Sequence, residues 1–540
     1  MWARLYNHKP AFQAEFTPSM RIVLTVLLLL SVAQASAQTL ERGNGPEPST
    51  LDAHKCPEVA CGNILRDLYE GLVTKDGKGN LIPGMAERWE VSGDGRTWTF
   101  YLRDNLKWSN GERLTSNDIV KSFQRAFTPM TAAPFAEHFE AIENAGEIMR
   151  GEKPPTSLGV TSPDPGIISI RLKRSAALLQ LLTLPTAYPV YLPGVERFSS
   201  QHTRPGNLVS NGAYRLQEWT PQSFVMLVLN LNFREPASIR SVRYHVTEDA
   251  SSELKRFESG GLHITETLPP QSLPALKKKF GGQLRISPYL GTFWFGFNLT
   301  QPPLKNNRAL REALSLAIDR EKLTRYVTGF GEQPAYALVP PGTADYSPVA
   351  LKWSKLAQTQ RENLARKKLL EAGIDKNKIL EIELRYNTST PHRRLSLAVA
   401  AMWRDVLGIK VRLRNEEWKV FVNNRKQKTI TQVFRGGWIA DVNDPRNFLS
   451  NFQSGNVVNW SGYNDKQYDA LMQQADEANT QRQRAALMQQ AEIRLLSEHA
   501  VMPVYFYVSK HLVSPQVQGY EANLLDHHPS RFLRLTEAAR

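Results

Sequence analysis

The stretch Arg435-Gly-Gly-Trp-Ile-Ala-Asp-Val-Asn-Asp-Pro445 is the point around which we expect this chain to be organised. It places the carboxylate of Asp441 in a turn made mostly of apolar residues and glycines. The two glycines leave bare backbone that another chain can approach closely, Trp438 offers a broad apolar wall, and Pro445 ends any regular strand. This combination suits a ligand that carries an ammonium group. The alternative is a surface turn in which Asp441 caps its own backbone.

Around this stretch, helical and extended patterns alternate from residue 300 onward. Apolar spacing and terminal glycines predict helices over 308–327, 362–372, 395–407 and 467–498, and strands over 382–386, 409–413 and 501–508. Before residue 300 the patterns predict a helix over 63–72, a helix capped at Thr115, and strands over 39–44, 98–103, 167–172, 224–233, 242–246 and 293–299. The last strand is aromatic on both faces, which indicates deep burial.

The N-terminal residues contain a secretion signal. Met20-Arg21 precede an apolar run from Ile22 to Ala33, and Ala35-Ser-Ala37 supplies a small-residue cleavage site. We therefore predict a signal peptide region over 1–37, with the signal itself over 20–37 and either methionine as the start. An apolar run this short does not make a transmembrane helix, and no cysteine follows the cleavage site to carry a lipid. We expect a soluble, exported protein.

Length and charge narrow the class of protein. The 540 residues predict two or three domains. The chain has 67 Lys and Arg residues against 52 Asp and Glu residues, a net charge of +15. The basic residues are scattered rather than clustered, and export separates the protein from nucleic acid, so we expect no nucleic-acid partner.

Cys56 and Cys61 are the only cysteines in the sequence, and an oxidising compartment allows them to pair. Two residues five apart in one continuous helix are too distant for a disulfide, so pairing requires a non-helical backbone around Pro57. Two free, partly buried thiols are the alternative. The spacing is a poor zinc signature, and we predict a local disulfide.

A search for catalytic motifs is largely negative. The sequence has no G-x-S-x-G elbow, no H-E-x-x-H helix and no P-loop. His527 and His528 could contact a metal, but without further ligands nearby in the sequence we expect them to be exposed polar residues. A carboxylate pair for glycoside hydrolysis stays open, because such pairs meet in space rather than in sequence. We expect no metal, no cofactor and no enzymatic activity.

Several ordered motifs together resemble one family. They are Arg66-Asp-Leu-Tyr-Glu-Gly-Leu72, Pro83-Gly-Met-Ala-Glu-Arg-Trp89, Lys107-Trp-Ser-Asn-Gly111, Glu417-Trp418 and Pro503-Val-Tyr-Phe-Tyr507. Across nearly all of the mature chain, the sequence resembles the periplasmic oligopeptide-binding proteins of ABC importers, which belong to the extracellular solute-binding proteins of family 5, the peptide/nickel-binding type.

The resemblance implies a mixed α/β fold with three domains in two lobes, similar to the type II, cluster C binding proteins, and a ligand cleft between the lobes. Domain I would be assembled from residues 38–69, 192–290 and 509–540. Domain II would span residues 70–191 and domain III residues 291–508. A peptide would be enclosed between domains I and III.

The resemblance also implies roles for individual residues. Asp441 matches the acid that holds the α-ammonium group of the peptide, and Gly437 lies beside the extended peptide backbone. Three side chains match those that meet peptide carboxylates, and we expect all three to act as cations: Arg435, Arg425 and His392. The remaining matches form pocket walls and other neighbours of the ligand: Trp438, Trp418, Val59 and Phe135.

Two departures from the family pattern stand out. A disulfide of some members would fall at Gly291 and Ile439, so it is absent here, and the pair of Cys56 and Cys61 is particular to this chain. A lysine that some members use for short ligands falls on Thr328.

These implications lead to one expected function. We expect a periplasmic monomer that binds oligopeptides in extended form and delivers them to the membrane permease of an ABC importer. Murein peptides, dipeptides or haem are alternative ligands within the family. A secreted hydrolase and an envelope chaperone are the alternatives from other classes.

Overall fold

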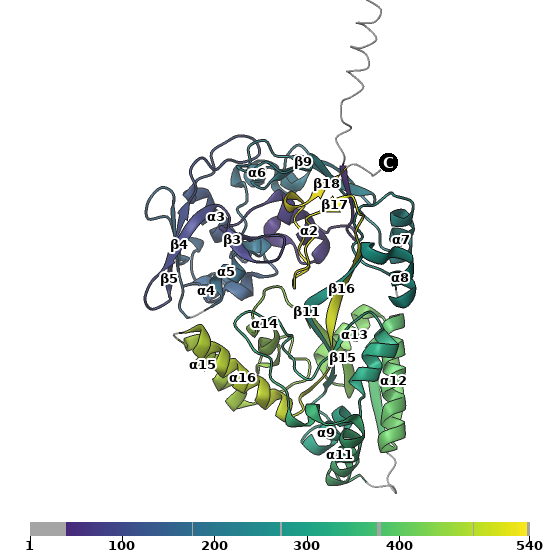
Figure 1. The fold of residues 1–540 in the computed structure, drawn as a ribbon. Helices are drawn as coiled ribbons and strands as arrows, with labels where there is room; N and C mark the ends of the chain where they lie inside the picture. The colour runs from purple at the N-terminus through teal and green to yellow at the C-terminus, as the bar shows by residue number, and fades with distance from the viewer. Residues whose placement is uncertain (1–38, 175, 270–272, 375–379, 479, 537–540) are drawn as a thin grey trace, which may run out of the picture.

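Two long strands join the two bodies of the protein, as the computed structural model shows (Figure 1). They are β11 (Leu284–Phe297) and β16 (Val501–Leu512), which pair with each other in antiparallel orientation. The structure describes residues 39–536 except 175, 270–272, 375–379 and 479, so the predicted signal peptide lies outside the described residues. Within that range no helix combines the length and the apolar composition needed to cross a membrane.

The aromatic half of β11 forms the centre of the lower body. Phe293, Phe295 and Phe297 have no exposed surface, which confirms the deep burial expected from an aromatic strand. The strand starts earlier than the predicted residue 293, because its first half pairs with β16 in the upper body. In the six-stranded sheet the order is β12-β16-β11-β15-β13-β14. The further strands are β12 (Gln333–Pro334), β13 (Glu381–Asn387), β14 (Lys410–Glu416) and β15 (Val433–Ile439).

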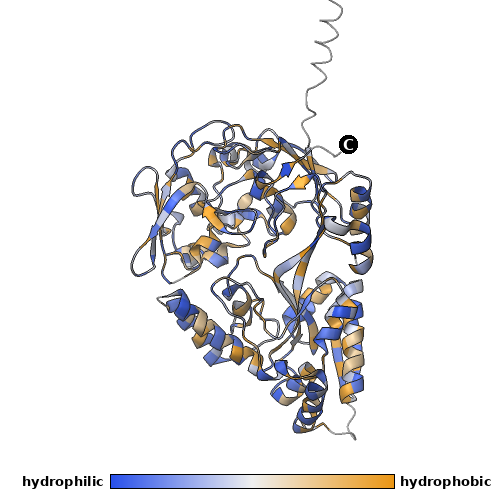
Figure 2. Cartoon of the chain, viewed as in Figure 1, coloured by the Kyte–Doolittle hydropathy of each residue, from blue (hydrophilic) through white to orange (hydrophobic). Residues whose placement is uncertain are grey.

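Helices surround this sheet. They are α9 (Arg308–Leu316), α10 (Arg320–Lys322), the π-helix η7 (Leu323–Thr328), α11 (Gln358–Glu371), α12 (Thr390–Leu407), α13 (Trp418–Gln427), α14 (Arg446–Leu449), α15 (Lys466–Glu477) and α16 (Gln481–Ser497). Figure 2 shows hydrophilic and hydrophobic residues alternating along α15 and α16, and the apolar ones include the fully buried Met472 and Met488. These helices therefore bury one face and expose the other.

One predicted helix is broken. A single helix over 308–327 was expected, but α9 ends at Ala317 and a new helix begins with α10. The cause is Asp319, whose side chain accepts a hydrogen bond from the backbone N–H of Lys322 and caps a new helix. The predicted end of α12 is confirmed, because Gly408 adopts a left-handed conformation with φ of 68° that favours glycine.

The upper body contains two four-stranded sheets. One has the order β1-β10-β9-β8, and the other β4-β5-β7-β6. Their strands are β1 (Thr39–Gly43), β8 (Tyr214–Thr220), β9 (Phe224–Leu229), β10 (Ser241–His245), β4 (Ala86–Val91), β5 (Thr97–Leu102), β6 (Val160–Thr161) and β7 (Ile167–Arg171). The predicted helix cap is confirmed, because Thr115 and Asp118 exchange hydrogen bonds at the start of α3 (Ser116–Ala126).

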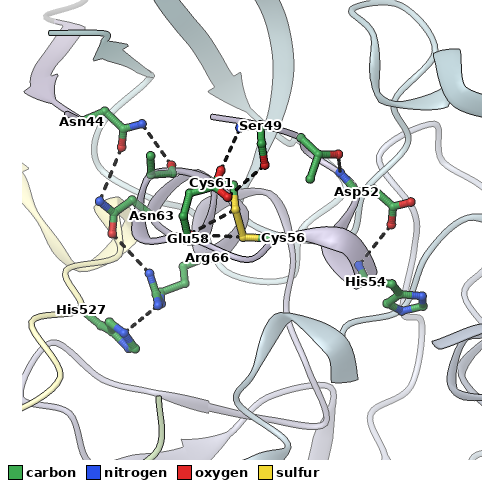
Figure 3. The surroundings of a disulfide bond; sticks show 12 residues. Asn44, Ser49, Asp52, His54, Cys56, Glu58, Cys61, Asn63, Arg66 and His527 are labelled. Carbon is green, nitrogen blue, oxygen red and sulfur yellow. Dashed lines mark hydrogen bonds between the residues drawn. A yellow bond between two sulfur atoms is a disulfide. The ribbon is translucent and has the colours of Figure 1, made fainter. Parts of the chain in front are cut away.

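Cys56 and Cys61 are joined by a disulfide next to α2 (Val59–Leu68) (Figure 3). Their Cα atoms lie 5.9 Å apart. Cys56 has an extended backbone between a short 3-10 helix and the start of α2, so the two residues do not belong to one continuous helix. This is the local geometry that pairing across Pro57 requires.

The disulfide can be tested by counting thiols. In protein that is denatured without reductant we expect no reactive thiol, and two after reduction. Because the closed loop is so short, replacing both cysteines with alanine should lower the unfolding free energy by less than the roughly 3 kcal/mol of a 15-residue loop. Two thiols in the unreduced protein would refute the bond.

Candidate functional site

Strand β15 has one edge that is largely unpaired. On one side it pairs with β11 along its whole length, from Val433 to Ile439. On the other side β13 pairs only with Val433 and Phe434. Within the described part of the chain, residues 435–439 therefore have no neighbouring strand at this edge.

The register shows which backbone groups face the free edge. The N–H of Ala440 donates a hydrogen bond of 2.8 Å to the carbonyl oxygen of Leu290. In an antiparallel pair only alternate residues exchange hydrogen bonds with the partner strand. The backbone groups of Arg435, Gly437 and Ile439 therefore point away from β11. They form a row of donors and acceptors with which an extended chain can pair.

The two glycines of β15 make room for aromatic side chains of the neighbouring strands. A Cβ atom at Gly436 would lie 2.2 Å from Nε1 of Trp294, and one at Gly437 would lie 2.8 Å from the hydroxyl oxygen of Tyr507. Both glycines were expected to offer bare backbone to a ligand. For Gly436 this expectation is wrong, because the Trp294 indole fills the space beside it. Gly437 keeps its backbone groups at the free edge.

Asp441 follows the strand in a loop that its neighbours hold in place. Asn447 accepts hydrogen bonds from Nε1 of Trp438 at 2.7 Å and from the backbone N–H of Asp441 at 3.3 Å. The carboxylate that caps this turn belongs instead to Asp444, which accepts from the backbone N–H of Arg446 and pairs with the buried Arg484. Asp441 itself is 28% exposed at its side chain and is not the capping residue.

A histidine from the upper body lies opposite Asp441. Nε2 of His138 is 3.6 Å from a carboxylate oxygen of Asp441, and the His138 ring stacks on Phe135 at 6.0 Å. Together with Trp438 these residues line a cavity of about 530 Å³ between the two bodies. The sequence analysis selected Phe135 and missed His138, although the two are only three residues apart: Phe135 immediately precedes the 3-10 helix η2 (Ala136–Phe139), and His138 lies within it.

Two arginines lie close together at the other end of β15. The guanidinium of Arg425 lies 3.4 Å from the ring centre of Trp460 and donates to the carbonyl oxygen of Arg435 at 3.4 Å. Arg435 donates to the hydroxyl of Tyr507, also at 3.4 Å. Burial and the nearby charge of Arg435 lower the pKa of Arg425 to about 9, so it stays charged at neutral pH.

This arginine pair has no counter-charge among the described residues, where neither guanidinium forms an ion pair with a carboxylate. Arg425 is only 4% exposed, and its Nε atom and that of Arg435 are buried with no hydrogen-bond partner among the residues that the structure describes. Burying an uncompensated charge is costly, and an anion placed between the two groups would offset that cost. The chemistry of the pair is suited to a carboxylate.

His392 joins the same cluster but does not add charge. Its ring lies 5.8 Å from that of Phe293, over which the Arg435 guanidinium also lies. Its Nδ1 faces the side-chain oxygen of Asn387 at 2.9 Å. Burial, and then the charge of Arg435, lower the pKa of His392 to about 3. The expectation of a third cation is therefore wrong, because burial beside Arg435 keeps the imidazole neutral.

Three other selected residues lie outside the cavity at Asp441. Trp418 is the first residue of α13, is 49% exposed and stacks on Phe421, which in turn contacts Arg425. Val59 is 55% exposed at the start of α2. Thr328 ends η7, and its hydroxyl donates to the carbonyl oxygen of Thr324, so this position supplies no cation.

Comparison with known proteins identifies the family. Residues 80–460 match the model for the middle region of the bacterial extracellular solute-binding proteins, family 5. The protein belongs to this family, and the two-lobed, mixed α/β fold class expected from the sequence is confirmed. The members of the family are substrate-binding proteins.

Three relatives illustrate the likeness. The chain is 37% identical to the periplasmic oligopeptide-binding protein OppA of Salmonella typhimurium, with 92% of this chain and 94% of the relative covered. It is 36% identical to the periplasmic murein peptide-binding protein MppA of Escherichia coli, with 91% of each covered. The structure of Haemophilus influenzae OppA in complex with the peptide RPPGFSPFR has a TM-score of 0.78 and 32% identity, with 93% of this chain and 99% of that chain covered.

Replacing Arg425 with methionine tests whether the arginine pair is uncompensated. The change removes one of two neighbouring buried charges, a desolvation cost of at least roughly 1–3 kcal/mol. It also loses the stacking on Trp460, worth about 0.5–2 kcal/mol. We therefore expect the ligand-free variant to melt at the parent temperature or above it in calorimetry, after bound ligand has been removed from both proteins.

Arg385→Met is the matched control. Arg385 has an 8% exposed side chain on the neighbouring β13 but is paired with the carboxylates of Glu383 and Glu416. Breaking such a buried pair costs roughly 3–5 kcal/mol, so this variant should melt well below the parent protein. An equal loss of stability in the two variants would show that Arg425 is already compensated.

Proposed function

We propose that this protein binds oligopeptides in extended form in the periplasm and delivers them to the permease of an ABC importer, without catalysing a reaction. The free edge of β15, placed between the carboxylate of Asp441 and the arginine pair, is the observation that carries this proposal. A peptide that adds as a strand satisfies its backbone hydrogen bonds whatever its side chains are. Its two charged ends meet groups of opposite charge.

The positions of the charges define the direction of the peptide. With its ammonium group at Asp441 and its carboxylate at Arg425 and Arg435, the peptide runs antiparallel to β15. Asp441 lies six positions after Arg435, which is roughly 20 Å at about 3.3 Å per residue. An extended peptide of about six residues spans this distance. Shorter peptides can also connect the two ends, because the side chains of Asp441 and of the two arginines extend toward the peptide and shorten the gap.

The remaining selected residues act around this peptide in the same proposal. Gly437 exposes its backbone groups to the ligand, and Trp438 and Phe135 form walls at its N-terminal end. Neutral His392 offers a hydrogen bond rather than a charge near its carboxylate. Trp418 and Val59, both half exposed in the ligand-free protein, become covered when the lobes close on the ligand.

The grouping of apolar side chains supports a division into three domains. One hydrophobic cluster draws all its buried members except Val442 from residues 72–187. A second draws on residues 40–69, 188–264 and 513–533, and two more lie within residues 290–525. We propose domain I over 38–69, 192–290 and 509–540, domain II over 70–191, and domain III over 291–508. Closure of the two lobes would present the surface that the permease recognises.

Asp441 provides the sharpest test of peptide binding. Its replacement by alanine leaves the ligand ammonium uncompensated in the closed cleft, at a cost of roughly 3–5 kcal/mol. We expect calorimetry to show peptide affinity falling by about two to four orders of magnitude. N-acetylated peptides should bind the parent protein equally poorly.

Asp405→Ala is the control, because Asp405 is an exposed carboxylate on α12 that pairs only with its neighbour Arg404. Its peptide affinity should match that of the parent. If free and acetylated peptides bind the parent protein equally well, Asp441 does not hold the ammonium group.

The natural ligands can be identified directly. Mass spectrometry of the material released on denaturing the purified protein should detect linear peptides of mixed sequence. Murein peptides are the second candidate, because the chain is 36% identical to a protein named for binding them. A single murein-derived species would favour that ligand, and recovery of cleaved peptides after incubation would point to the alternative of a hydrolase.

A further inference from the structure

Three potential metal ligands converge in the upper body, far along the chain from the peptide site. They are His511, near the end of β16, and Asp526 and His528, between β17 (Val517–Gln518) and the 3-10 helix η10 (Ser530–Phe532). One ligand atom from each lies within 4.8 Å of the other two. Nε2 of His511 is 2.8 Å and Nε2 of His528 is 2.9 Å from carboxylate oxygens of Asp526.

The cluster is buried, which corrects an expectation from the sequence. His528 was expected to be an exposed polar residue, but its side chain and that of His511 are each 6% exposed. The ring of Tyr520 stacks on His528 with 4.1 Å between the ring centres and covers it. The hydroxyl of Tyr520 is itself buried without a hydrogen-bond partner among the described residues.

The surroundings orient the ligand atoms before any metal arrives. Nδ1 of His511 lies 2.8 Å from the carbonyl oxygen of Thr265 and donates its hydrogen to it, so Nε2 is directed at Asp526. A backbone or carboxylate acceptor on the second ring nitrogen is the usual support of a metal-bound histidine. Arg42 donates to the backbone carbonyl of His528 at 2.7 Å and fixes that segment as well.

The hydrogen bonds of the cluster fix where its protons lie. Both ring nitrogens of His511 face oxygen acceptors, so this ring carries two protons, and Nε2 of His528 must also carry one to donate to Asp526. When a divalent cation binds both Nε2 atoms, His511 releases its Nε2 proton and keeps the one on Nδ1, and the single proton of His528 moves from Nε2 to Nδ1. The ligand atoms are already close enough that only small shifts would bring them to metal-ligand distances.

We propose that His511, Asp526 and His528 form a binding site for a divalent transition metal such as Zn²⁺. Two imidazole nitrogens and a carboxylate favour zinc, copper or nickel over magnesium and calcium, which prefer oxygen ligands alone. The ligands join the C-terminal segment to β16, the strand shared by the two bodies. The metal therefore has a structural role, because it holds the segment that contains Asp526 and His528 against β16. This proposal does not depend on the proposed peptide binding.

Zinc titration of the parent protein tests the site directly. Tag-free protein is treated with EDTA, dialysed and titrated with ZnCl₂ in a calorimeter at pH 7.5. We expect one zinc ion per chain, a melting temperature that rises with zinc and falls back with EDTA, and weaker binding at pH 5.5 because protons compete for the imidazoles. Failure of the parent protein to bind one equivalent of zinc overturns the proposal.

Variants then locate the ion. His528→Gln removes a ligand while keeping a hydrogen-bond donor for Asp526, and it should reduce zinc affinity at least tenfold with little change in the melting temperature of the metal-free protein. His527→Gln is the matched control, because Nε2 of His527 accepts from Arg66 at 2.6 Å and does not belong to the cluster. Equal zinc affinity in the parent and His528→Gln would overturn the proposal, since the zinc would then be held by other residues.

Discussion

The pairing of β11 with a strand on each side is the constraint on which the rest of the structure depends. In the upper body β11 pairs with β16 alone, while in the lower body it holds β16 on one side and β15 on the other. Because β13 reaches only the first two residues of β15, the following residues have no strand partner on that edge among the described residues. The same hydrogen-bonded strands thus connect the two lobes and present the edge at which a ligand can bind.

The two guanidinium groups at that edge have no carboxylate partner among the described residues of the lower body. Two of its buried arginines pair with carboxylates: Arg385 with two glutamates, and Arg484 with Asp444. Arg425 and Arg435 differ because only aromatic rings and polar oxygens surround them. Among the described residues, Arg425 and Arg435 therefore lack the carboxylate partners that Arg385 and Arg484 have, and their chemistry suits an anion.

Much of the fold could be predicted from local sequence, because its signals are local. Gly408 and Thr115 mark helix ends through their own backbone and side-chain chemistry, and the alternation of aromatic residues in β11 marks burial on both faces. The acid and the two arginines were found through a family resemblance that compares positions one by one. No spacing rule would have joined Arg425 to Arg435, which meet only after α13 packs against the sheet.

The expectations that proved wrong share one cause, because each depended on a tertiary contact. Gly436 is small because Trp294 needs the space, His392 is neutral because it is buried and also lies beside Arg435, and His528 is buried because Tyr520 stacks on it. Trp294 and Arg435 are distant in the sequence from Gly436 and His392, whereas Tyr520 lies on the same C-terminal segment as His528. Asp319 is the exception, since a capping residue inside a predicted helix is a local signal that could have revealed the break.

A site that closes a carboxylate over one end of a strand and arginines over the other recognises where a chain begins and ends rather than what it contains. Such a site accepts many different fragments yet ignores any chain that lacks two free ends close together in extended form. Cyclic peptides and the interior segments of folded proteins fall into this excluded group. In the proposed binding mode, the free edge of β15 would therefore separate the peptides released by proteolysis from intact proteins without contacting any particular side chain.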